Sequence, residues 1–317
     1  MFSTIPIFHV FGIWFALTIP GLSPDVVVLL GPARGPPSVE LAETVLDYGK
    51  PDGAVFPPFL IEAASQNPRA WAKLKTLDLI IYGGAPLSER IGHELAKTTN
   101  LWGAIGCTEG CGFPGLVLPS EDWDYFRFHP FNGIEFEQQG DLNLYEMVIK
   151  KTPTSNHTHG IFRSFPDQDV YRIKDLYTRH PAKPDLYKYS GRTDDLVLLT
   201  GEVKLYAKAI EDAVRKHAYV KDVIVGGDKR IVPFMLVELD ETHGEVSEDV
   251  IDDFWGYIEG VNQRNAESAM IRQDLTIFTQ KPFKMTPKGS VERRTTLEEH
   301  QATIDNLYIA YEAQPKA

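Results

Sequence analysis

Residues 77–110 read LDLIIYGGAPLSERIGHELAKTTNLWGAIGCTEG, and this stretch decides the fold. Its apolar start, 77–82, predicts a buried strand, which the turn Gly83-Gly84-Ala85-Pro86 follows at once. A helix is predicted over 89–98 and a second apolar strand over 101–105. A strand, a helix and a strand in succession form a βαβ unit, so we expect a mostly parallel sheet.

The residues before this stretch continue the alternation. The run 26–30 (VVVLL) predicts a buried strand, and 53–56 predicts a short one. A helix is predicted over 59–66. Another is predicted to follow the N-cap Ser38 and to end at Gly49, because four apolar positions share one face: Val39, Ala42, Val45 and Leu46.

The rest of the chain changes character twice. Segments 134–138 and 142–149 predict a β-hairpin, and short strands near 161–165 and 186–190 extend it into a small antiparallel or barrel-like subdomain. After Arg192 the pattern is that of a compact α+β unit, with helices and strands over 207–217, 223–225, 231–239, 248–261 and 275–279.

These patterns predict the α/β class. A chain of 317 residues exceeds what one hydrophobic core usually serves, so two domains are expected. We predict a βαβ sheet with a small β-barrel-like subdomain in 1–193 and a smaller α+β domain in 194–317.

Composition excludes several classes of protein. The net charge of −12 argues against a nucleic-acid partner, because phosphate neutralisation needs clustered Lys and Arg. Two cysteines, Cys107 and Cys111, give no disulfide framework and a poor zinc site, which favours a reducing, cytoplasmic compartment. The apolar run 8–20 is too short to span a membrane and lacks the basic flank of a signal peptide, so no membrane partner is expected.

Two loops follow successive predicted strands and are candidate ligand sites. Gly83-Gly84-Ala85-Pro86 lets the backbone approach a ligand, and Gly106-Cys107-Thr108-Glu109-Gly110 places a hydroxyl beside a carboxylate. Thr108 can donate to a phosphate oxygen, and the Glu109 carboxylate is a hard ligand suited to Mg²⁺. The alternatives are an ordinary turn and an ordinary polar loop.

Four further residues have both a functional and a structural interpretation. Arg192 can bind phosphate or form a surface salt bridge, and Asp175 can accept from ribose hydroxyls or be a loop carboxylate. Lys288, in the loop Thr286–Ser290, can bind an anion or be a solvated lysine. His9 lies in an aromatic context and can face a ligand or simply pack. No spacing identifies a Ser-His-Asp or Cys-His hydrolase.

Taken together and in this order, these segments resemble the adenylate-forming (AMP-binding) superfamily. The resemblance is closest to adenylation domains of fungal nonribosomal-peptide-synthetase-like enzymes and carboxylic acid reductases. It covers nearly the whole chain and is carried by Pro6–Gly12, Tyr82–Leu87, Gly106–Glu109, Asp122–Pro130, Tyr171–Leu176, Gly191–Asp195 and Lys284–Arg294.

The resemblance implies that a carboxylic acid attacks ATP to give an acyl-adenylate and pyrophosphate, with Mg²⁺ as cofactor. A thiol, either CoA or the phosphopantetheine of a carrier protein domain acting in trans, then takes the acyl group. Residues 1–193 would be part of the AMP-binding N-terminal domain, and 194–317 the small C-terminal adenylation subdomain.

The resemblance also implies a role for each candidate residue. Gly83, Gly84, Ala85 and Pro86 would line the adenine and acyl pocket, with His9 and Gly106 on the substrate side. Thr108 would contact phosphate, Glu109 would hold Mg²⁺, and Asp175 would bind the ribose. Arg192 would assist at ribose or phosphate, Asp194 would be the hinge, and Lys288 would bridge carboxylate and phosphate during adenylation.

Three features depart from the family pattern. The family's phosphate-binding loop lies upstream of the segment with His9, outside this sequence, so we expect this chain by itself to adenylate poorly. Ile105 stands where an aromatic residue is usual, and Ile173-Lys174 where Thr-Gly is typical. The alternatives to an adenylation domain are an acyl-CoA synthetase and a non-catalytic nucleotide- or acyl-binding fragment, and the first of these departures favours the non-catalytic fragment.

Overall fold

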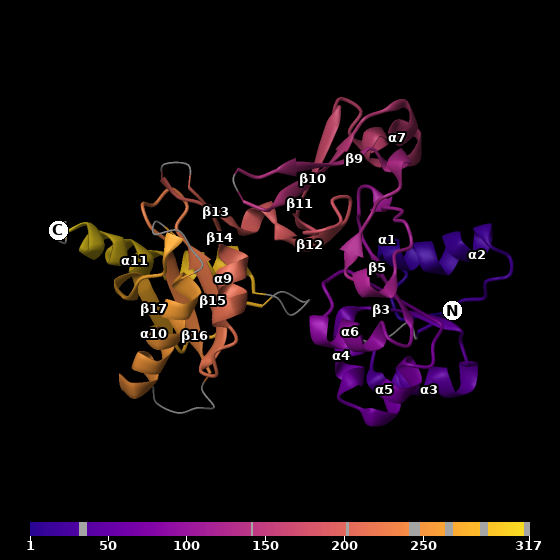
Figure 1. The fold of residues 1–317 in the computed structure, drawn as a ribbon, viewed down its shortest axis with the longest axis horizontal. Coiled ribbons are helices and arrows are strands. Elements are labelled where there is room, and N and C mark those ends of the chain that lie inside the picture. The colour runs from indigo at the N-terminus through magenta and orange to yellow at the C-terminus, as the bar shows by residue number, and fades with distance from the viewer. Residues whose placement is uncertain are drawn as a thin grey trace. The chain divides into compact units, whose positions relative to one another are not determined.

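The computed structural model describes residues 1–31, 37–140, 142–200, 203–240, 248–263, 269–285 and 291–313. The chain divides into two compact units, Met1–Gly191 and Arg192–Ala317 (Figure 1). Both units mix helices with sheets, so the predicted α/β class is confirmed.

A parallel five-stranded sheet is the centre of the first unit, as the βαβ pattern predicts. Its strand order is β2-β1-β3-β4-β5, and each neighbouring pair is parallel. The strands are β1 (Phe2–Ser3), β2 (Leu29–Leu30), β3 (Gly53–Phe56), β4 (Leu79–Gly83) and β5 (Asn100–Ala104).

The predicted buried strand over 26–30 is wrong for most of its length. Only Leu29 and Leu30 join the sheet, and they do so as its edge strand. Val27 is 72% exposed, so an apolar run alone did not establish burial here.

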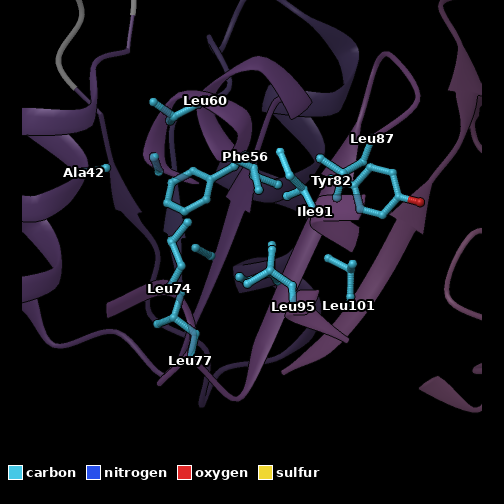
Figure 2. Close-up of a cluster of buried hydrophobic side chains, with 14 of the residues drawn as sticks. Ala42, Phe56, Leu60, Leu74, Leu77, Tyr82, Leu87, Ile91, Leu95 and Leu101 are labelled. Atoms are coloured by element: carbon cyan, nitrogen blue, oxygen red, sulfur yellow. The ribbon is translucent and has the colours of Figure 1, made fainter. Parts of the chain in front are cut away.

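Four helices cover one face of this sheet: α3 (Val39–Gly49), α4 (Pro58–Ser65), α5 (Pro68–Leu74) and α6 (Glu89–Leu95). Figure 2 shows how their apolar side chains meet Phe56 and Tyr82 from the strands. Strand residues alternate between the faces, since Ala54 and Phe56 join this cluster while Val55 faces the other side.

The predicted start of helix α3 is confirmed, whereas helix α5 starts where no helix was predicted. The Ser38 side chain accepts from the Leu41 amide, which confirms it as the N-cap of α3. Helix α5 was not predicted, because Asn67-Pro68 reads as a stop. Asn67 instead caps this new helix by accepting from the amides of Arg69 and Ala70 at 3.0 and 3.1 Å.

The opposite face of the sheet carries a continuous helical run over residues 10–22. It comprises α1 (Val10–Ile13), a π-helical stretch (Trp14–Thr18) and α2 (Ile19–Leu22). Phe15 packs there against Val55 and Ile81. No helix in the described part of the chain is long and apolar enough to cross a bilayer.

A second five-stranded sheet completes the first unit, with order β8-β12-β11-β10-β9. Its strands are β8 (Tyr125–Phe126), β9 (Ile134–Gln138), β10 (Tyr145–Lys150), β11 (Val170–Arg179) and β12 (Tyr187–Arg192). The predicted hairpin is confirmed, because β9 pairs antiparallel with β10. Fully buried Tyr177 lies among the rings of Phe126, Phe136 and Tyr189.

The predicted strand over 161–165 is wrong, since Ile161–Ser164 is the short helix α8. It follows α7 (Pro153–Thr158), which starts with a capping box between Thr152 and Ser155. Ile161 and Phe162 are both buried, and a short apolar run does not distinguish strand from helix by periodicity.

The second unit is built on a mixed three-stranded sheet of order β15-β16-β17. Strand β15 pairs antiparallel with β16, and β17 pairs parallel with β16. Helices α9 and α10 pack on one face and α11 on the other. Helix α11 was not predicted, because only Thr296, Ile304 and Tyr308 of its 20 residues are buried. The elements are β13 (Leu196–Leu198), β14 (Lys204–Tyr206), α9 (Ala207–Val214), β15 (Val220–Gly226), β16 (Phe234–Leu239), α10 (Glu248–Asn262), β17 (Thr276–Thr279) and α11 (Arg293–Glu312).

Candidate functional site

Two of the predicted ligand loops leave the same edge of the parallel sheet. Gly83, the last residue of β4, is the register partner of Ala104, the last residue of β5. Gly84 has φ = +88°, and a Cβ there would meet no atom within 4 Å, so the backbone conformation rather than crowding favours glycine. Gly84, Ala85 and Pro86 are exposed and accessible to a ligand.

Thr108 and Glu109 lie at the tip of a tight hairpin directly after β5. Its strands are β6 (Gly106–Cys107) and β7 (Cys111–Gly112), and Cys107 is the register partner of Cys111. The Gly110 amide donates to the Cys107 carbonyl at 3.3 Å. Thr108 and Glu109 are both exposed, so a hydroxyl and a carboxylate are presented side by side.

The groups beside Glu109 stay neutral at physiological pH. Burial, with a smaller contribution from the Glu109 carboxylate, raises the pKa of the Cys107 thiol to about 11. Tyr171 of β11 packs against the same buried cluster as Cys107, and burial together with the Glu109 carboxylate raises the pKa of Tyr171. Neither side chain therefore adds negative charge where phosphate is predicted to bind.

Asp175 lies at an irregularity in β11. Glu146 pairs with Leu176 but Val148 pairs with Arg172, so extra residues of β11 bulge out between these two pairs. Lys174, inside the bulge, has φ = +66°, the left-handed conformation that glycine adopts at little cost. Asp175 is 9% exposed and contributes, after burial, to raising the pKa of Tyr177.

Arg192 and Asp194 belong to the second unit and contact each other there. Arg192 Nε lies 3.7 Å from Asp194 Oδ2, and the two side chains are 47% and 67% exposed. The Arg192 amide donates to Asp195 Oδ2 at 2.8 Å across the 3₁₀ turn Thr193–Asp195. An exposed pair of this kind contributes little stability, so a phosphate could replace Asp194 as the partner of the guanidinium.

Lys288 lies outside the described residues, but both flanks of its loop are described. Met285 and Val291 form an antiparallel bridge, and the Glu292 amide donates to the Lys284 carbonyl at 2.6 Å. The described residues on either side of the loop are therefore paired with each other.

Two buried carboxylates bind these flanking residues. Glu238 of β16 accepts from the Phe283 amide at 2.8 Å, and Glu211 of α9 pairs with Arg293 at 2.5 Å. Both acids are at most 5% exposed. Neither contact could be predicted from the sequence, because an acid in a strand or helix gives no sign that it pairs with a residue 45 or 82 positions away.

His9 and Gly106 border a cavity but do not line it. His9 is exposed and occupies the N-cap position of α1 without a side-chain cap bond, and its ring is tilted against that of Phe8 with centroids 4.9 Å apart. The cavity, of about 320 Å³, begins at the next residue, Val10, and lies between the helical run 10–22 and residues 110–114. We call it the helix–hairpin cavity.

The arrangement suits a nucleotide and one Mg²⁺ at the carboxyl edge of the sheet. No group of three or more His, Cys, Asp or Glu that could hold a metal occurs among the described residues. Mg²⁺ is commonly held by one or two carboxylates together with substrate phosphates and water. Glu109, exposed beside the Thr108 hydroxyl, fits that mode of binding.

Comparisons with known proteins identify the relatives of the chain. Residues 193–312 match the family model of the AMP-binding enzyme C-terminal domain. A carboxylic acid reductase of Neurospora crassa is 30% identical over 312 residues, which cover 96% of this chain and 30% of that protein. An isocyanide synthase–NRPS hybrid of Aspergillus fumigatus is 29% identical over 97% of the chain and 19% of its own length.

Solved structures show the same fold. ATP-bound MatB from Rhodopseudomonas palustris has a TM-score of 0.64 at 17% identity and covers 96% of this chain and 60% of its own. A benzoate CoA ligase from Burkholderia xenovorans has a TM-score of 0.60 at 19% identity, with coverages of 93% and 60%. The chain thus spans less than a third of the curated relatives named above and about three fifths of these solved proteins.

Proposed function

We propose that this chain, which is similar to a fungal carboxylic acid reductase and to fungal adenylate-forming reductases and matches the AMP-binding enzyme C-terminal domain over residues 193–312, serves the activation of a carboxylic acid by ATP. In this reaction a carboxylate oxygen attacks the α-phosphorus. The bond between that phosphorus and the bridging oxygen breaks, and pyrophosphate leaves. The product is an acyl-adenylate, a mixed anhydride that a thiol can open.

One observation carries the proposal. The pairing of Gly83 with Ala104 brings a glycine-containing loop and the Thr108–Glu109 tip to one edge of a parallel sheet. Open α/β sheets bind ligands at the carboxyl ends of their strands. The exposed backbone of Gly84 to Pro86 would receive adenine, and the Thr108 hydroxyl would donate to phosphate.

The other candidate residues would complete the reaction. Mg²⁺ held by Glu109 would neutralise charge on the phosphate oxygens. Asp175 would accept from the ribose hydroxyls, and Arg192 would leave Asp194 to pair with phosphate or ribose. Lys288 would offer its ammonium to the oxygen that gains charge as the carboxylate attacks.

We further propose a thiol acceptor and a hinge. The acyl group would pass to phosphopantetheine on a carrier domain or to CoA, with loss of AMP. Asp194 would absorb the backbone rotation that turns Lys288 away between the two steps, since hinges are a few residues that absorb large φ/ψ changes.

Nucleotide binding tests the proposal on this chain. We expect isothermal titration calorimetry to detect AMP binding that Asp175→Asn weakens about tenfold or more, because a charged hydrogen bond to ribose is lost. Glu109→Gln should weaken MgATP binding but leave AMP binding unchanged. Absence of AMP binding by the unaltered chain would contradict the proposal.

Catalysis is tested separately. Acid-dependent exchange of pyrophosphate into ATP distinguishes an adenylating enzyme from a non-catalytic nucleotide-binding protein. CoA-dependent thioester formation then distinguishes a CoA ligase from a chain that serves a carrier domain.

A further inference from the structure

Two cysteines face each other across the hairpin that carries Thr108 and Glu109. Cys107 of β6 and Cys111 of β7 are direct register partners in an antiparallel ladder, and both are free thiols. Directly opposite residues of such a ladder have Cα atoms about 4.5–5.5 Å apart. A disulfide usually joins residues whose Cα atoms are about 4.4–6.8 Å apart, so the backbone of the hairpin has the spacing that a disulfide needs.

The two thiols differ in exposure. Cys111 is exposed, whereas Cys107 is half-buried and packs against the buried cluster that contains Phe113 and Ile161. An exposed thiol is the one that a dissolved oxidant reaches first. Cys107, directly opposite on the other strand, is then placed to attack the oxidised sulfur of Cys111.

The hairpin is closely packed on both sides of the two cysteines. A Cβ on Gly106 would lie 2.1 Å from the Cys111 carbonyl oxygen. A Cβ on Gly112 would lie 1.5 Å from a ring carbon of Trp14. Because the stem has so little free space, we expect the adjustment to a new S–S bond to fall on the three-residue tip, Thr108–Gly110.

We infer that Cys107 and Cys111 form a reversible disulfide that constrains the tip of the hairpin and weakens the binding of MgATP. The effect on MgATP rests on the proposed function, which assigns Thr108 to phosphate and Glu109 to Mg²⁺. Mg²⁺ demands nearly ideal octahedral geometry, with oxygen ligands at about 2.0–2.1 Å. A small displacement of the Glu109 carboxylate is therefore enough to weaken the binding of the metal.

The oxidant is a small-molecule disulfide such as oxidised glutathione. The Cys111 thiolate attacks one sulfur of oxidised glutathione, the S–S bond between the two glutathiones breaks, and one of them leaves. The Cys107 thiolate then attacks the Cys111 sulfur and displaces the second glutathione. Two protein thiols are thus oxidised to one disulfide. One oxidised glutathione is reduced to two thiols, which take up the protons of the protein thiols.

Three features make this disulfide reversible rather than structural. It closes a loop with only Thr108, Glu109 and Gly110 between the cysteines, so it removes little entropy from the unfolded chain. The exposed sulfur of Cys111 is accessible to a reducing thiol. Exposed disulfides are readily reduced, and transient, redox-sensing disulfides are the kind that occurs in reducing compartments.

Mass spectrometry tests disulfide formation independently of nucleotide binding. The full chain is treated with oxidised glutathione, and the remaining thiols are blocked with N-ethylmaleimide. Both cysteines lie in one tryptic peptide, residues 98–127. We expect this peptide to lose two hydrogen atoms and to take up no maleimide, and we expect dithiothreitol to restore both thiols. A peptide that keeps two free thiols, or that carries only glutathione adducts, overturns the inference.

Calorimetry on the same samples tests the effect on the site. The oxidised chain should bind MgATP at least about tenfold more weakly than the reduced chain. AMP, which the proposed function places at Asp175, should bind within about threefold of its affinity for the reduced chain. The matched control is Cys111→Ser, which removes the exposed thiol and keeps the size of the side chain. Treatment with oxidised glutathione should change the MgATP affinity of this variant by less than about twofold.

The outcomes separate this inference from the proposed function. If the disulfide forms but MgATP binds equally to the oxidised and reduced chains, the inference is overturned and the proposed function stands. An equal loss of AMP affinity, or an equal loss of MgATP affinity in treated Cys111→Ser, also overturns the inference. If the reduced chain binds neither AMP nor MgATP, the proposed function fails, and the inferred control of MgATP binding fails with it.

Discussion

Replacing Lys174 with glycine should stabilise the first unit. Lys174 holds φ = +66° inside the bulge of β11, and its side chain is exposed. A left-handed conformation costs a residue with a Cβ roughly 1–2 kcal/mol, while glycine loses about 0.5–1 kcal/mol more backbone entropy on folding. The difference is a gain of about 0.5–1 kcal/mol.

Chemical denaturation measures this gain, and calorimetry should show the transition of the first unit about 1–3 °C higher. Lys174→Ala is the matched control, because it removes the same long side chain but keeps the Cβ. A gain for alanine equal to that for glycine would assign the effect to the side chain. A loss of stability in Lys174→Gly would refute the argument from backbone conformation.

Four more predictions concern Glu211, Cys107, Glu109 and Lys288. Glu211→Ala should destabilise the second unit by about 2–4 kcal/mol in urea denaturation, because it leaves Arg293 and the Val225 amide without their buried acceptor. The control is Asp212→Ala on the exposed face of α9, which should destabilise the unit by less than about 1 kcal/mol. Cys107, whose pKa is raised to about 11, should be alkylated more slowly than exposed Cys111. Mass spectrometry should show that the alkylation rate of Cys107 rises about tenfold per pH unit up to pH 11, since only the thiolate reacts. An alkylation rate of Cys107 that does not change with pH would contradict the burial argument. Glu109→Gln should make Cys107 react faster at pH 8, because it removes a nearby negative charge. Lys288→Ala should lower acyl-adenylate formation by orders of magnitude and spare thiol transfer from a supplied adenylate, and a change in adenylation within about twofold would leave Lys288 a solvated lysine.

Local sequence patterns predicted three of the five strands of the first sheet, β3, β4 and β5, but not β1 and only the end of β2. Apolar runs bounded by glycine, proline and capping residues gave β3 without a shift, and β4 and β5 within two residues of their predicted ends. Such signals act over a few residues, so they are present in the sequence itself. The local patterns failed where packing with distant residues determines the structure. Ile161–Ser164 is a helix instead of the predicted strand, and Val27 is exposed instead of buried.

The candidate ligand loops were also predictable, because glycines, hydroxyls and carboxylates next to strand ends are visible in order. What sequence order does not contain is which of these segments meet. The register of β4 on β5 decided that Gly83 and the Thr108 hairpin share an edge. The packing of residues 10–22 on the hairpin decided the position and size of the helix–hairpin cavity.

The sequence by itself therefore determined the alternation of strands and helices and the chemistry available in each loop. Only the tertiary structure decided that β11 bulges and puts Lys174 in a left-handed conformation, and that the carboxylates of Glu238 and Glu211 bind Phe283 and Arg293 on either side of the Lys288 loop. The physical reason is the separation along the chain over which each interaction acts. Propensity, capping and turn chemistry act between residues that are neighbours in the chain. Burial and ion pairing join residues that come together only when the chain folds.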